Sequence, residues 1–175
     1  MHIGIIVYSQ TGHTYSVAQR LEQALSAAGH TVTLERLQQV GESKPGDEAD
    51  ADIADADIRI QSVEDVQFET LPDIEPYDAL VFGAWVEGFS LTPVMASYFK
   101  QVASLQGKQV ACFVTKQLPF HWTGGNRAIR QMKAFCTSKG ANVLGSGIVI
   151  WGSKQRDQRI NEAVDRLSHL PWSGA

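Results

Sequence analysis

The chain has 175 residues, of which 43% are hydrophobic, and a formal net charge of −4. This length and composition predict a single globular domain over residues 1–175 rather than a disordered chain. The net negative charge gives no reason to expect binding to nucleic acid or to an anionic membrane surface. No apolar run reaches about 18 residues and no signal peptide is recognisable, so we expect a cytoplasmic protein without a membrane span.

Strand and helix patterns alternate from the start of the chain. Residues 3–8 form a nearly continuous run of apolar β-formers, typical of a strand buried on both faces of a parallel sheet. From Thr14 apolar residues recur at helical spacing as far as Gly29, a residue that favours a helix C-terminus. Residues 31–37 then alternate between polar and apolar side chains, which predicts a second strand.

The least regular part of the sequence follows, and we expect an acidic insertion at residues 41–76. Within it, residues 47–57 (DEADADIADAD) contain six acidic residues and no basic one. A calcium loop of the EF-hand type needs a glycine at its sharp turn, and none is present here. We therefore predict a solvated insertion and no metal site.

The rest of the chain returns to regular alternation. Strand patterns occupy residues 77–83, 108–115 and 142–151, and helix patterns begin at Pro93 and cover residues 124–139 and 156–170. Strands alternating with helices predict a five-stranded parallel sheet with helices on both faces, a three-layer α/β sandwich. Two cysteines in apolar patterns are expected to be buried thiols in a reducing compartment.

A polar loop separates the first strand from the first helix, and it reads Ser9, Gln10, Thr11, Gly12, His13 and Thr14. The N–H groups at a helix N-terminus attract anions, and a glycine lets the backbone approach a ligand closely. One hydroxyl residue is enough to cap a helix, whereas this loop has three, so we predict phosphate binding. The loop has neither the lysine of a P-loop nor the glycines of a dinucleotide fingerprint, which favours a monophosphate.

The hexapeptide SQTGHT resembles the [ST]-x-T-G-x-T phosphate loop of the flavodoxin family, which binds FMN. The resemblance extends over nearly the whole chain, because residues 77–83 (YDALVFG) are similar to the family's third strand. The loops after residues 83 and 115 are similar to the two loops that flank the flavin ring. The resemblance implies a flavodoxin-like fold with strand order 2-1-3-4-5, FMN as the cofactor, and binding of its phosphate by residues 9–14.

The same resemblance implies which residues contact the flavin ring. After residue 83 we expect backbone groups at the ring edge and Trp85 or Phe89 on a ring face, although Trp85 alternatively seals the sheet or a subunit contact. After Thr115 we expect a pocket wall, with Lys116 near the pyrimidine end of the ring. The expected ring contacts are Ala84, Trp85, Val86, Glu87, Gly88, Thr115, Lys116, Gln117, Phe120, Trp122, Gly124 and Gly125.

Three functions remain open at this point. The first is an FMN oxidoreductase that takes hydride from NAD(P)H and reduces a quinone or similar small acceptor, with the flavin supplying the chemistry. The second is a one-electron carrier that docks on redox proteins, although flavodoxins of that kind carry more negative charge than this chain. The third is a flavin-free binding module, against which the intact phosphate loop argues. The electron donor, the acceptor and a homodimeric state stay open.

Overall fold

The computed structural model describes residues 1–42, 66–120 and 122–173. Five parallel strands form the sheet in the order β2-β1-β3-β5-β6. Their bounds are β1 His2–Val7, β2 Thr31–Arg36, β3 Ala79–Glu87, β5 Gln109–Lys116 and β6 Asn142–Ile150. This confirms the predicted parallel sheet and its strand order.

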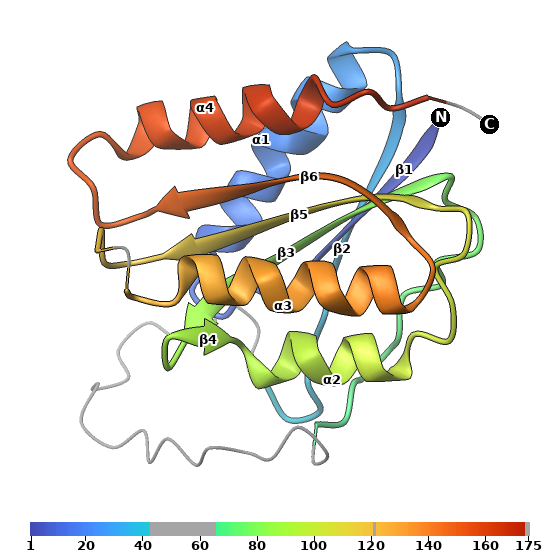
Figure 1. The fold of residues 1–175 in the computed structure, drawn as a ribbon, viewed down its shortest axis with the longest axis horizontal. Coiled ribbons are helices and arrows are strands. Elements are labelled where there is room, and N and C mark those ends of the chain that lie inside the picture. Colours follow the sequence, from blue (N-terminus) through green and yellow to red (C-terminus); the bar gives the residue numbers. More distant parts are fainter. Residues whose placement is uncertain (43–65, 121, 174–175) are drawn as a thin grey trace.

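Helices cover both faces of the sheet (Figure 1). One face carries α1 (His13–Ala27) and α4 (Arg156–Ser168), and the other carries α2 (Pro93–Gln101) and α3 (Gly125–Ser138). The apolar residues of β1 divide between the two faces: Ile3, Ile5 and Val7 pack towards α1 and α4, and Ile6 packs towards α2 and α3. The three-layer sandwich is therefore built as the alternating sequence predicts.

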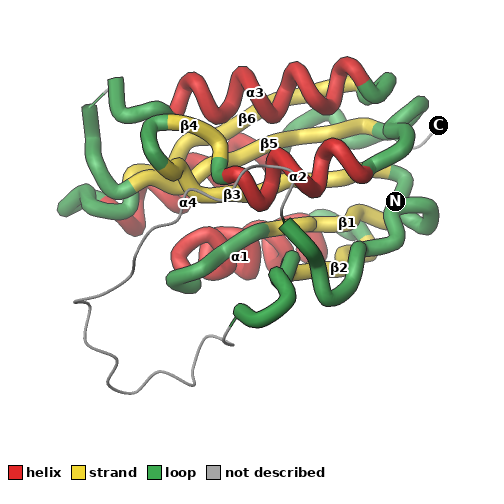
Figure 2. Tube along the Cα trace, turned by 90° about the horizontal axis from the view of Figure 1, so that it is seen from below, coloured by secondary structure: helices red, strands yellow, loops and turns green. Residues whose placement is uncertain are grey.

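The end of β3 differs from the sequence prediction. Residues 84–87 were expected in a loop, but they continue β3 and pair with the two-residue antiparallel strand β4 (Ser90–Leu91). The connecting residues Gly88 and Phe89 both have positive φ, 54° and 62°. Two successive residues with positive φ make the tight turn that joins antiparallel strands. This hairpin lies beside the start of α3 (Figure 2).

The predictions about the cysteines and the absence of a membrane-spanning helix can be compared with the structure, whereas the prediction about the acidic insertion largely cannot. Cys112 and Cys136 are both free and fully buried, as predicted. The acidic run at residues 47–57 lies outside the described residues, and so does most of the predicted insertion. No helix of the described ranges has the length and hydropathy needed to cross a bilayer.

Candidate functional site

The first helix begins with a set of free backbone donors. Gly12 precedes α1 with φ 85°, and no atom lies within 4 Å of the position a Cβ would take there. In the described part of the chain, the N–H groups of residues 10–14 make no hydrogen bond. The first turn of α1 also contains no acidic residue. Free N–H groups at the positive end of a helix, beside open space, suit an anion such as a phosphate.

The hydroxyl groups of this loop are used in different ways. Ser9 is buried and its Oγ accepts a hydrogen bond from the N–H of Tyr15 at 3.2 Å, which anchors the loop to α1. The Oγ1 of Thr14 lies 2.7 Å from the Oγ1 of Thr115 at the end of β5, and both residues are buried. One hydroxyl of this pair donates to the other, so only one keeps a proton for a ligand. Thr11 is exposed.

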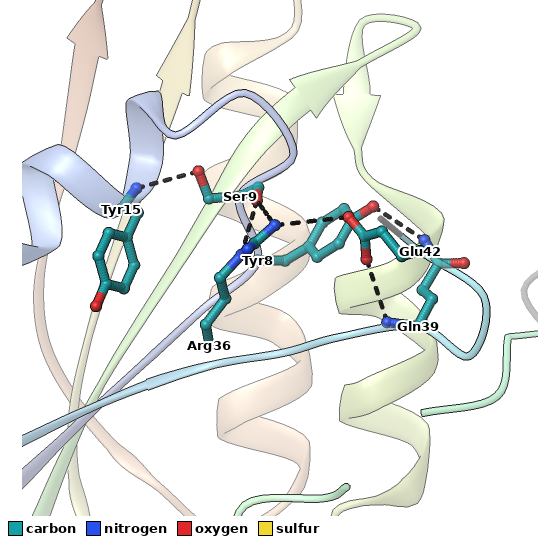
Figure 3. Close-up of polar contacts among 6 residues, drawn as sticks. All are labelled: Tyr8, Ser9, Tyr15, Arg36, Gln39 and Glu42. Carbon is teal, nitrogen blue, oxygen red and sulfur yellow. Dashed lines mark hydrogen bonds and ion pairs between the residues drawn. The ribbon is translucent and has the colours of Figure 1, made fainter. Parts of the chain in front are cut away.

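Arg36, the last residue of β2, holds the loop from below (Figure 3). Its Nε and Nη2 donate to the carbonyl oxygen of Ser9 at 3.0 and 2.5 Å. Nη2 also lies 3.7 Å from Oε1 of Glu42. Arg36 was not among the predicted site residues, although the expected strand order puts the end of the second strand beside the end of the first. A positive charge therefore lies directly under the phosphate loop.

Tyr8 belongs to the same network (Figure 3), and its OH accepts a hydrogen bond from Nε2 of Gln39 at 2.9 Å. Burial, and after it the nearby Glu42 carboxylate, raise the pKa of Tyr8 from 10 to about 12. The phenol is therefore neutral at physiological pH. Its raised pKa links the stability of the fold to pH.

We expect the free energy of unfolding to fall as pH rises from 10 towards 12. The folded protein favours the protonated phenol, so its contribution is complete below pH 10 and is lost through pH 12, at up to roughly 1.4 kcal/mol per pH unit. Urea unfolding of the apoprotein at pH 9 and pH 11 measures this loss. Tyr8→Phe should lose less stability than the wild type, because Tyr77 and Tyr98, whose pKa values are also raised by burial, still contribute to the loss but Tyr8 no longer does. An equal loss in both proteins would contradict the prediction.

His13 does not point its ring along the polar loop. The ring stacks on Trp151, with centroids 4.1 Å apart and planes 16° from parallel. The guanidinium of Arg156 also lies over the Trp151 ring, 4.9 Å from the ring centroid. Burial, followed by the positive charge of Arg156, lowers the pKa of His13. Neither Trp151 nor Arg156 was predicted as a site residue, although Trp151 ends the strand predicted at residues 142–151.

The loop after β5 is stabilised by hydrogen bonds from the side chain of Lys116, the last residue of that strand. The Nζ of Lys116 donates to the carbonyl oxygen of Phe120 at 2.8 Å and to Oγ1 of Thr123 at 3.0 Å. Burial lowers the pKa of Lys116. The lysine therefore stabilises the loop that the sequence analysis expected to flank the flavin ring, and its charge lies beneath that loop.

The two expected ring loops touch each other at Gly124. This residue has φ 87°, and a Cβ on it would come within 2.2 Å of the carbonyl carbon of Phe89. Gly124 was expected to contact the flavin ring. In the structure it lets the loop approach the β3–β4 turn, which fixes both loops relative to one another.

The four aromatic side chains of these loops differ in exposure: one is partly buried and three are exposed to solvent. Trp85 is partly buried against the core below α2 and α3, and its Nε1–H is buried without a hydrogen-bond partner in the described residues. Phe89, Phe120 and Trp122, which we call the aromatic rim, are 51%, 52% and 70% exposed. Trp122 stacks on Phe120 at 5.6 Å and lies 5.9 Å from Phe89. The aromatic rim is thus more accessible to a ligand than Trp85.

The other expected ligand-binding residues lie at the same carboxyl edge of the sheet. Those that are exposed or partly exposed are Gln10, Val86, Glu87, Gly88 and Gln117. Ala84 and Gly125 are buried, so only their backbones are near the surface loops. The structure therefore gathers the residues of all three predicted loops at one edge.

Comparison with known proteins identifies the family to which this chain belongs. The chain matches the flavodoxin family model over residues 5–163. It belongs to the flavodoxin family. The family that the sequence resembles is thereby confirmed. The matched range includes every strand except the first residues of β1, and every helix except the end of α4.

Solved flavodoxins share the fold of this flavodoxin-family chain. A flavodoxin from Streptococcus pneumonia TIGR4 superposes with a TM-score of 0.62 and 13% identity, over 96% of this chain and 98% of that one. Oxidised Flavodoxin 2 from Bacillus cereus has a TM-score of 0.62 and 16% identity, over 94% and 96%. A flavoprotein from Lactobacillus acidophilus NCFM, solved in complex with FMN, has a TM-score of 0.56 and 15% identity, over 93% and 97%.

Proposed function

We propose that this protein binds FMN, with the phosphate at the start of α1 and the ring along the carboxyl edge of the sheet. The observation that carries the proposal is the set of free N–H groups at residues 10–14 beside the open space at Gly12. Membership of the flavodoxin family and the FMN complex of the Lactobacillus acidophilus flavoprotein support it. When bound, FMN supplies hydride acceptance and electron donation.

We further propose an oxidoreductase that takes hydride from NAD(P)H and reduces a quinone or similar small acceptor. For each quinone, one hydride and one proton are consumed, and NAD(P)⁺ and one hydroquinone are released. The aromatic rim supports this proposal, because exposed rings beside the flavin loops offer a packing surface for a planar acceptor. The phosphate loop and its Arg36 anchor would hold and orient the cofactor during the reaction.

A one-electron carrier is the second candidate. The aromatic rim also favours it, because an exposed apolar patch is typical of a protein docking surface. The two candidates differ in whether a nicotinamide nucleotide reduces the flavin directly.

Two measurements on the purified protein test these proposals. Its absorbance spectrum, and chromatography of the flavin released on heating, should identify FMN. Steady-state oxidation of NADPH and NADH should accelerate when a soluble quinone is added. Recovery of FAD alone, or failure of the apoprotein to take up FMN, contradicts the cofactor proposal. Bound FMN without nucleotide oxidation favours the carrier.

Thr11→Ala is expected to weaken FMN binding by about tenfold or more. The Thr11 side chain is exposed on the phosphate loop and makes no hydrogen bond within the described residues, so its hydroxyl is free to donate to a phosphate. Hydrogen bonds to charged groups contribute roughly 1.5–3 kcal/mol. Fluorescence titration of the apoprotein measures the affinity, and riboflavin, which lacks the phosphate, is the control. Equal losses for FMN and riboflavin would place this hydroxyl away from the phosphate.

A further inference from the structure

A cavity of about 900 Å³ is lined by residues of the edge strand β6 and of the helices α3 and α4. Figure 1 shows that these two helices lie on opposite faces of the sheet. Its lining includes three basic residues of α3, Arg127, Arg130 and Lys133, and Arg166 of α4. No lining residue is acidic. Across the described ranges, none of these four side chains takes part in an ion pair. Four unpaired positive charges around one cavity favour an anionic ligand.

The cavity, which we call the edge groove, reaches the loops of the proposed flavin site. Phe89, Trp122 and Gly124 line it where α3 begins. From there the basic residues of α3 recur at every third position, so they extend about 9 Å along the helix axis. The edge groove therefore joins exposed aromatic rings at one end to a row of cations leading away from them.

We propose that the edge groove binds the phosphates of NADPH, with the nicotinamide at the Phe89 and Trp122 end. This inference rests on the proposed function and names its electron donor. NADPH carries roughly four negative charges at neutral pH, two on the diphosphate and up to two on the 2′-phosphate, which match the four cations. NADH lacks the 2′-phosphate, so about half of the four cations in the edge groove would have no negative charge of the ligand opposite them.

The shape and chemistry of the edge groove favour this ligand over a protein partner. Its volume lies within the range of roughly 300–1,000 Å³ that is usual for small-molecule sites. Three of its four cations are arginines, whose planar guanidinium groups bind phosphate oxygens in pairs. Basic side chains beside an edge strand also discourage pairing with other strands, and that role requires no ligand. The two roles predict different responses to NADP⁺.

The test uses the FMN-loaded protein and titrates it with NADP⁺ and NAD⁺ by calorimetry. We expect NADP⁺ to bind at least tenfold more tightly than NAD⁺. Arg130→Gln/Arg166→Gln, which removes one cation from each wall, should weaken NADP⁺ binding at least tenfold. Lys100→Gln, which removes an exposed cation from α2, is the control and should leave the affinity unchanged.

The outcomes separate this inference from the proposed function. If NADPH reduces the flavin and the double variant binds NADP⁺ as tightly as the wild type, the edge groove is not the nucleotide site and the proposed function stands. If NADP⁺ binding depends on Arg130 and Arg166 but NADPH does not reduce the flavin, the groove assignment stands and the proposed function fails. If the wild type does not bind NADP⁺, the inference is overturned and the basic residues are assigned to protection of the edge strand.

Discussion

Replacing Gly124 with alanine is expected to lower the free energy of unfolding by about 2–5 kcal/mol. Two costs add at this position. An alanine with φ 87° costs about 1–2 kcal/mol, and the new Cβ would approach the Phe89 backbone to 2.2 Å, a clash whose relief costs roughly 1–3 kcal/mol more. Backbone atoms cannot rotate away as a flexible side chain can, so the β3–β4 turn or the loop after β5 must shift.

Gly12→Ala is the matched control for Gly124→Ala. Gly12 has nearly the same φ, 85°, but open space where its Cβ would lie, so only the backbone strain of about 1–2 kcal/mol applies. Urea unfolding of both apoproteins measures the difference. Equal losses for the two variants would show that the contact between the loops contributes nothing to stability.

Replacing Arg36 with methionine is expected to weaken FMN binding by about tenfold to a hundredfold. The guanidinium donates two hydrogen bonds to the Ser9 carbonyl and places a positive charge under the phosphate loop. Methionine keeps most of the side-chain length and removes both the charge and the donors. Loss of a charged hydrogen-bonding group costs roughly 1.5–3 kcal/mol, and each 1.4 kcal/mol is a factor of ten in affinity.

The neighbouring carboxylate provides a test of opposite sign. Glu42 lies 3.7 Å from Arg36 and places a negative charge near the loop, so Glu42→Gln should strengthen FMN binding. The double variant Arg36→Met/Glu42→Gln controls for a carboxylate left without its partner. Riboflavin affinity should change little in all three variants. Equal effects on FMN and riboflavin would indicate that Arg36 acts by shaping the ring site and not through the phosphate.

Most of the fold could be predicted from local sequence patterns. The continuous apolar run of β1, the helical spacing that begins at Thr14 and the later strand–helix alternation led to the parallel sheet that the structure contains. The exception is β4, because a two-residue strand has no periodicity to detect. Its turn places Phe89 at φ 62°, a conformation that non-glycine residues seldom adopt. No feature of the sequence predicts this conformation at Phe89.

The candidate site divides in the same way, between what neighbours in sequence determine and what contacts between distant segments decide. The sequence alone determined a polar loop with a glycine at the start of a helix, because capping and helix polarity are local properties. Only the tertiary structure decided that Arg36 anchors this loop, that His13 stacks on Trp151, and that Gly124 contacts Phe89. These pairs are brought together by strand order and loop packing. No pattern within a single segment records the position of a side chain from another.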